Sequence, residues 1–179
     1  MKKVFLYFVS GVSGVGKTAT LTQLKKLLPE QYDVRDLDER GVPDGGGPEW
    51  LATETRHWVD IANDNSLQGI TTVVCGFANP EVFLKIHKET DVPALLVLLD
   101  ARGETIQERL LGRYPTKESE KEIERASGTT LESFVENCVS FAPKLRKLFD
   151  TYQMPVVETD TKTPEEVGRE VATIITREG

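Results

Sequence analysis

The chain has 179 residues, of which 39% are hydrophobic and 28% are charged, a composition that suits one globular domain able to bury its own core. Its net charge of -7 argues against a general nucleic-acid-binding protein, because such proteins usually present a basic face. No apolar run approaches the roughly 18 residues that a membrane-spanning helix requires, so we expect no membrane partner.

Two features bear on the cellular compartment. Cys75 and Cys138 lie far apart in apolar surroundings and form no C-x-x-C pair, so we expect two reduced, buried thiols and a cytoplasmic protein. The start of the chain, with two lysines and a short apolar run, superficially resembles a signal peptide. The run leads directly into the best motif in the chain, which cleavage would destroy, so we interpret residues 4–10 as a buried strand.

A glycine-rich loop follows that strand and precedes a predicted helix at 18–28. Its sequence GVSGVGKT fits the P-loop pattern G-x-x-x-x-G-K-[ST], and the strand before it and helix after it are the context that the pattern requires. Successive backbone N–H groups at a helix N-terminus form an anion site, in which Lys17 reaches the β- and γ-phosphates and Thr18 ligates Mg²⁺. The alternative is a glycine turn with an incidental lysine. The expected nucleotide-binding residues here are Gly11, Val12, Ser13, Gly14, Val15, Gly16, Lys17, Thr18 and Ala19.

Strand patterns continue to alternate with helix patterns along the rest of the chain. After a loop rich in glycine and proline at 38–50, helices are expected at 50–63, 80–87, 104–113 and 131–152, with a last one that begins at Pro164. We expect Asn79 to cap the helix at 80–87, and Thr163 to cap the last helix with Glu166 three residues after it. Further strands are expected at 32–37, 70–75, 93–99 and 155–158. This alternation predicts an α/β fold in which helices cover both faces of a parallel sheet. We find no repeat or linker, so residues 1–179 form one predicted domain.

Two carboxylates follow the second predicted strand. Asp36 and Asp38 are two residues apart, so their side chains lie on the same face. We expect Asp36 to hold Mg²⁺ through water and Asp38 to accept a proton from a substrate hydroxyl or to orient it. The alternative is a solvated acidic strand end, which the neighbouring Glu39 makes credible.

Two further residues are candidates for binding a phosphoryl acceptor. Arg56, on the helix after the glycine-rich loop, is a candidate for an anionic or hydroxylated acceptor, although a surface arginine on an amphipathic helix fits equally well. Gly76 ends the third strand and offers a place where substrate can approach the backbone, although a simple strand-to-helix turn explains it as well.

Arginines gather before a polar segment that we predict to be a lid at about 113–129. Arg109 and Arg113 are four residues apart and share a helix face. Phosphoryl transfer spreads negative charge over oxygens that arginines stabilise, and a lid excludes water from the reaction. The alternative is an ordinary charged helix followed by a surface loop.

These motifs together resemble the small P-loop kinases, a superfamily that includes shikimate kinase, gluconate kinase, chloramphenicol phosphotransferase and the adenylate kinase group. The resemblance rests on "GVSGVGKT", "DLD", "ITTVVCGF", "ERLLGR" and "ETDTKTPEEV". It implies a three-layer α/β/α fold with a five-stranded sheet in the order 2-3-1-4-5 and a lid. It also implies that Asp160 and Thr161 line the adenine, and that Asp38 and Arg56 bind the acceptor within a region of about 38–69.

The sequence departs from each individual member of that superfamily in the acceptor region. The loop "GVPDGGGPEW" is unlike the shikimate kinase pattern, and the lid lacks the dense arginines of a nucleoside monophosphate kinase. No N-K-x-D guanine signature is present, which favours ATP as the donor.

The leading hypothesis is therefore an ATP- and Mg²⁺-dependent phosphotransferase that acts on a small metabolite. A nucleoside or nucleotide kinase is the alternative within that class. The alternative outside it is a nucleotide-binding switch or NTPase without a small-molecule acceptor. The sequence indicates neither the acceptor nor the oligomeric state.

Overall fold

The computed structural model describes residues 6–178. Its five parallel strands form one sheet in the order β2-β3-β1-β4-β5, which confirms the predicted topology. The strands are β1 (Leu6–Ser10), β2 (Tyr32–Asp36), β3 (Thr71–Cys75), β4 (Ala94–Asp100) and β5 (Val156–Glu158). The first two residues of the predicted strand at 4–10 lie outside the described residues.

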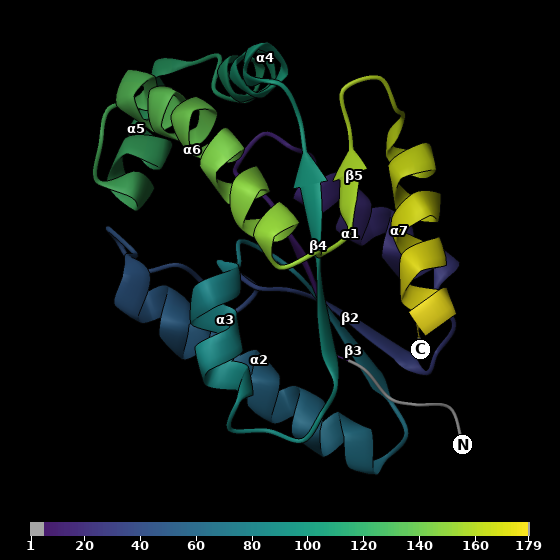
Figure 1. The fold of residues 1–179 in the computed structure, drawn as a ribbon. Coiled ribbons are helices and arrows are strands. Elements are labelled where there is room, and N and C mark those ends of the chain that lie inside the picture. Colours follow the sequence, from purple (N-terminus) through teal and green to yellow (C-terminus); the bar gives the residue numbers. More distant parts are fainter. Residues whose placement is uncertain (1–5, 179) are drawn as a thin grey trace.

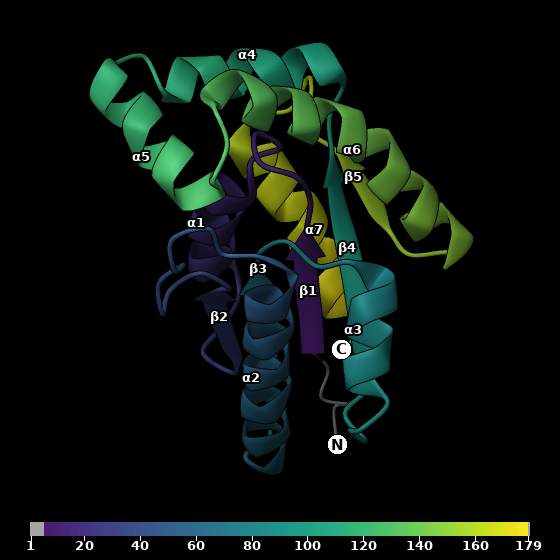
Figure 2. The same cartoon turned by 90° about the vertical axis from the view of Figure 1, so that its left-hand side faces the viewer.

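Helices cover both faces of this sheet, as Figures 1 and 2 show. α1 (Lys17–Leu27) and α7 (Pro164–Glu178) pack together on one face. α2 (Pro48–Leu67), α3 (Pro80–His87) and α6 (Leu131–Thr151) cover the other face. α4 (Gly103–Arg113) and α5 (Lys117–Ser127) lie beyond the carboxyl ends of the strands. The predicted three-layer α/β/α architecture is thus confirmed.

The central strands are buried on both sides, which explains why they read as continuous apolar runs. Every residue of β1 and β3 is buried, and the core extends into the helices through Phe83 of α3, Leu110 of α4 and Phe149 of α6. Within the described part of the chain, no helix is both long and apolar enough to cross a membrane.

Local helix signals are confirmed where they depend on neighbouring residues only. Asn79 caps α3 by accepting hydrogen bonds from the backbone N–H groups of Glu81 and Val82. Thr163 and Glu166 form the predicted capping box at the start of α7.

The predicted lid contains a helix that the sequence reading left out. α5 begins with a capping box between Thr116 and Ser119 and ends at Gly128, which adopts the left-handed conformation. No described residue of α5 is buried. Its polar sequence hid it from a search for apolar periodicity, because the capping signals alone mark its ends.

Candidate nucleotide and phosphoryl-transfer site

The P-loop joins β1 to α1 at the carboxyl edge of the sheet. Gly11 passes so close to β4 that a Cβ there would lie 2.6 Å from the Leu99 carbonyl oxygen, and Gly16 has a φ of 106° at the α1 N-cap. Neither position accepts another residue without strain. The buried Ser10 hydroxyl anchors the start of the loop by donating to Ala78 O (2.9 Å) and accepting from Ala78 N (2.8 Å).

Lys17 lies folded over this loop. Its Nζ donates to Gly11 O at 2.8 Å and to Val12 O at 2.9 Å, which leaves one N–H for a ligand. Burial lowers the pKa of Lys17, the charge of Asp38 opposes this shift, and the charge of Arg113 adds to it. The resulting pKa is about 8. The ammonium therefore stays mostly charged at neutral pH, in surroundings where its charge is weakly screened.

The two predicted aspartates lie together near Lys17. Asp36 Oδ1 accepts a hydrogen bond from Asp38 N at 3.1 Å, which fixes the turn after β2. Loss of solvation and then the charge of Asp36 raise the pKa of Asp38, while Lys17 opposes the shift. The sheet edge thus gathers a cation and two carboxylates, and Asp38 is the carboxylate whose proton affinity is increased.

Sequence reasoning missed a third carboxylate in this group. Glu54 lies on the buried face of α2 with 6% of its surface exposed, and its Oε2 has no hydrogen-bond partner in the described structure. Its Oε1 lies 3.6 Å from Arg40 Nη1, and its charge contributes to the raised pKa of Asp38. The available signal was its spacing, three residues after Leu51 and four before Trp58, which places it on the apolar side of the helix.

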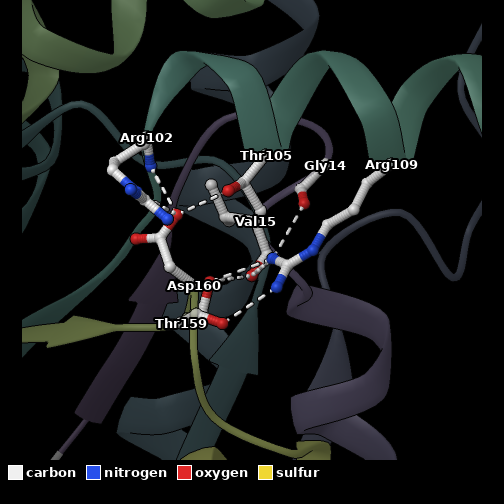
Figure 3. Close-up of polar contacts among 7 residues, drawn as sticks. All are labelled: Gly14, Val15, Arg102, Thr105, Arg109, Thr159 and Asp160. Atoms are coloured by element: carbon white, nitrogen blue, oxygen red, sulfur yellow. Dashed lines mark hydrogen bonds and ion pairs between the residues drawn. The ribbon is translucent and has the colours of Figure 1, made fainter.

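Arg109 and Thr159 form the polar framework on the opposite side of the P-loop (Figure 3). Arg109 Nη1 donates to Gly14 O (3.3 Å) and Thr159 Oγ1 (3.0 Å), and Nη2 donates to Thr159 O (2.8 Å). The Thr159 hydroxyl in turn donates to Val15 O at 3.0 Å. Arg109 therefore ties α4, the P-loop and the segment after β5 together.

Asp160 is committed to the same framework. Its Oδ1 accepts hydrogen bonds from Arg102 N (2.9 Å) and Thr105 Oγ1 (2.7 Å), so it caps α4 from a distant part of the chain (Figure 3). These bonds from the start of α4 lower the pKa of Asp160, although its desolvation works against them. Thr161 is exposed on the following turn. The structure thus brings Asp160 beside the nucleotide side of the P-loop, but with its carboxylate already bonded.

Two cavities flank the P-loop. The first, of about 370 Å³, lies between α1, α4 and the start of α7. Its walls include Gly16, Ala19, Arg109, Arg113, Thr159 and Lys162. Of the residues predicted to bind the nucleotide, Gly14, Val15, Gly16, Ala19 and Arg109 line this cavity.

The second cavity, of about 270 Å³, lies on the other side of the same loop and is lined by Lys17. Its walls come from the P-loop, from Phe77 after β3, and from α6, which contributes Phe134, Cys138 and Phe141. The α6 residues went unnoticed in the sequence because they follow ordinary helical spacing. Cys138 was expected to be buried and is only half-buried, because it faces this cavity beside Ser13. Both cysteines are free thiols, as expected.

Arg113 contrasts with Arg109 one helical turn away. It is exposed, lines the first cavity and makes no hydrogen bond or ion pair with any described residue. Its charge is felt at Lys17. The lid that follows reaches across the site, where Arg125 on α5 lies 3.6 Å from Asp44 in the glycine-rich loop.

Two residues predicted to bind the acceptor already have close contacts within the protein. Arg56 is exposed and forms an ion pair with Glu89, which follows α3 near the amino edge of the sheet. At Gly76, a Cβ would lie 2.1 Å from the Cβ of Leu37. The structure therefore gives this glycine a packing role.

The residues expected at magnesium fit that ion in type. Thr18 is exposed at the first turn of α1, and Asp36 lies in electrostatic range of Lys17. In the described residues, no group of three or more His, Cys, Asp or Glu side chains is arranged to hold a metal. A hydroxyl and a carboxylate are the kind of donors that Mg²⁺ uses when phosphates and water complete its coordination.

Comparison with known proteins supports the fold and leaves the substrate open. No protein-family profile matches the chain, and no curated protein matches it in sequence. A putative kinase from Chloroflexus aurantiacus has a TM-score of 0.64 at 18% identity, over 99% of this chain and 100% of that one. A sugar kinase from Janibacter sp. has a TM-score of 0.60 at 15% identity, over 98% and 95%.

A shikimate kinase from Acinetobacter baumannii, solved with shikimate, has a TM-score of 0.53 at 13% identity, over 98% of this chain and 94% of that one. Such identities establish a shared fold alone. The chain has the fold of the P-loop kinases, with the sheet order 2-3-1-4-5.

Proposed function

We propose that this protein is a phosphotransferase that moves the γ-phosphoryl group of ATP, bound with Mg²⁺, to a hydroxyl group of a small molecule. One observation carries the proposal: two separate cavities flank the P-loop, one beside Arg109 and Arg113 and one lined by Lys17, Phe77 and α6. A protein that only hydrolyses a nucleotide needs the first cavity. A second cavity on the other side of the same loop, lined by Lys17, suits an acceptor.

The reaction divides among the chain's own residues as follows. The acceptor oxygen forms a bond to the γ-phosphorus while the bond from that phosphorus to the β–γ bridging oxygen breaks and ADP leaves. Asp38, with its raised pKa, accepts the hydroxyl proton and passes it to solvent. Lys17 and the unpaired Arg113 stabilise the charge on the transferring group.

Mg²⁺ neutralises charge on the phosphates when it is bound, and Thr18 and Asp36 are the residues that would hold it. Arg109 acts indirectly, because it positions the P-loop by donating hydrogen bonds to the carbonyls of Gly14 and Val15. α5 has no buried residue among those described, so the lid has little packing to lose when it moves.

The proposal is tested by incubating purified protein with ATP, Mg²⁺ and a broad panel of hydroxylated compounds, and by identifying phosphorylated products by mass spectrometry. We expect acceptor-dependent ADP formation that is lost in Lys17→Met. Slow release of free phosphate that no acceptor accelerates would favour the switch or NTPase function. ADP formation that depends on a nucleoside or nucleoside monophosphate would favour a nucleoside or nucleotide kinase.

A further inference from the structure

The cavity lined by Lys17, Phe77 and α6, which we call the acceptor side, has largely aromatic and apolar walls. α6 presents Phe134, Cys138 and Phe141 to it, at positions that share one helix face. Phe77 faces them from the loop after β3, and its ring centroid lies 6.0 Å from that of Phe141 at an interplanar angle of 50°. All three phenylalanines remain partly exposed. A ligand that covers these rings removes apolar surface from water, which favours binding.

The same cavity offers little to a charged ligand. Lys17 is the single charged side chain among the described residues that line it. That ammonium is already required by the transferring phosphoryl group. A carboxylate or phosphate on the acceptor would lose its hydration on entering this cavity and would gain no charged partner there. Burying an unpaired charge in this way is costly.

Neutral polar groups are also few. Ser13 lies within hydrogen-bonding reach of the Cys138 thiol, so part of its capacity is used inside the protein. Asn137 is exposed at the cavity mouth and is free to bind one polar substituent. A compound with several hydroxyl groups would turn most of them toward phenyl rings, where their hydrogen bonds with water would not be replaced.

Size narrows the ligand further. The cavity holds about 270 Å³, whereas a protein cavity of about 150 Å³ accepts benzene. There is room for one substituted ring, and the exposed Asn137 at the mouth shows that the cavity opens to solvent on one side.

We infer that the phosphoryl acceptor is an uncharged aromatic alcohol of about one substituted ring, whose ring packs against Phe77, Phe134 and Phe141 and whose hydroxyl group faces Lys17. This inference rests on the proposed function, since it names the substrate class of that site. It separates the protein from kinases of sugar acids and of phosphorylated acceptors, because the acceptor wall carries no guanidinium among its described residues.

Benzyl alcohol, 4-(hydroxymethyl)benzoate and gluconate are suitable probes, because the first two differ only by a carboxylate. Binding of each is measured by ligand-observed NMR with the Mg²⁺ complex of a non-hydrolysable ATP analogue present. We expect benzyl alcohol to bind at least about tenfold more tightly than either acid, since an unpaired charge costs more than that factor. Equal or tighter binding of an acid would overturn the inference.

Phe134→Ala is expected to weaken binding of benzyl alcohol about tenfold, because it removes one aromatic wall. Tyr152→Ala is the matched control, since it deletes an exposed ring at the end of the same helix, outside the cavity. Phe134→Leu keeps an apolar wall and is expected to give an intermediate affinity. Unchanged affinity for the nucleotide analogue shows that each variant is folded. If both Phe134 variants bind benzyl alcohol with unchanged affinity, benzyl alcohol binds outside this cavity and the inference is wrong.

Turnover with ATP separates this inference from the proposed function. Phosphorylation of gluconate but not of benzyl alcohol would leave the kinase function standing and would refute the aromatic acceptor. Phe134-dependent binding of benzyl alcohol, with no phosphorylated product from any compound in the broad panel, would support the cavity assignment and refute the kinase function.

Discussion

The two cavities that flank the P-loop differ in the side chains that surround them. On the nucleotide side, Arg109 and Thr159 bond to each other and to P-loop carbonyls, while Asp160 accepts hydrogen bonds from Arg102 and Thr105. On the acceptor side, phenyl rings line the cavity, and the carboxylates of Asp38 and Glu54 lie near the site with little internal pairing. Preorganised polar groups suit a ligand of fixed chemistry such as a nucleoside triphosphate. Apolar walls change easily with sequence, so they are where related kinases would differ in acceptor.

The largest expected effect comes from Lys17→Met, which removes the ammonium group that lies against the P-loop and lines the second cavity. We expect phosphoryl transfer to fall by about 10³-fold or more, because no other described side chain replaces that ammonium at the P-loop. Initial rates at saturating ATP measure this loss. Transfer that falls less than tenfold would contradict the role given to Lys17.

The same variant is expected to stabilise the protein without ligand. Burial lowers the pKa of Lys17 to about 8 from 10.5, so the charged form costs the folded state on the order of 1–3 kcal/mol at neutral pH, part of which its two hydrogen bonds offset. Between pH 8 and pH 10.5 the unfolded chain binds more protons at this group, so this penalty shrinks as pH rises. Denaturant melts of both proteins at pH 7 and pH 10 measure the narrowing difference.

Arg109→Lys tests the hydrogen-bond network on the nucleotide side alone. Lysine cannot reproduce bonds from two guanidinium nitrogens to Gly14 and Thr159, so we expect a loss of about 2 kcal/mol in free energy of unfolding and weaker ATP binding. Arg113→Lys is the matched control, because Arg113 has no hydrogen bond to lose within the described chain. It is expected to slow transfer while leaving the melting temperature within about 1 °C. Equal destabilisation by both variants would show that the network adds nothing specific.

Asp38→Asn tests the acceptor side. The folded protein holds the pKa of Asp38 above its usual value of 3.8, so ionisation of this group costs stability, and the cost appears as pH rises through that shifted pKa. We expect the variant to melt higher than the parent at pH 7, with the difference fading toward pH 3.8 and below. Transfer is expected to fall by about 10²-fold, while the affinity for nucleotide is retained. Asp60→Asn, at an exposed position of α2, controls for lost surface charge.

Glu54→Gln gives the smallest expected effect. Glu54 is one of the charges that raise the pKa of Asp38, so its removal lowers that pKa and shifts the acidic limb of the pH–rate profile to lower pH. The shift is expected to be a fraction of a pH unit, since desolvation and Asp36 contribute more. An acidic limb that moves upward, or does not move, would separate Glu54 from the site.

Features set by neighbouring residues were predicted from the sequence. The P-loop needs glycines and a lysine in one contiguous stretch, and helix caps such as Asn79 and Thr163 act over three residues. The sheet order came from resemblance to known kinases, because alternating strands and helices fix a parallel sheet but allow several orders. Arg56 shows the limit of this reasoning, since a helix position says nothing about a distant partner such as Glu89.

The sequence by itself determined the α/β class of the fold and the place of the glycine-rich loop between β1 and α1, because those properties follow from local periodicity and from a motif whose geometry is local. Only the tertiary structure decided which long-range partners complete the site. Arg109 meets Thr159 across 50 residues, and Phe77 meets Phe141 across α3, β4, α4 and α5. Such pairings depend on where the sheet places the ends of its strands, and the free energy of packing the whole core fixes that placement.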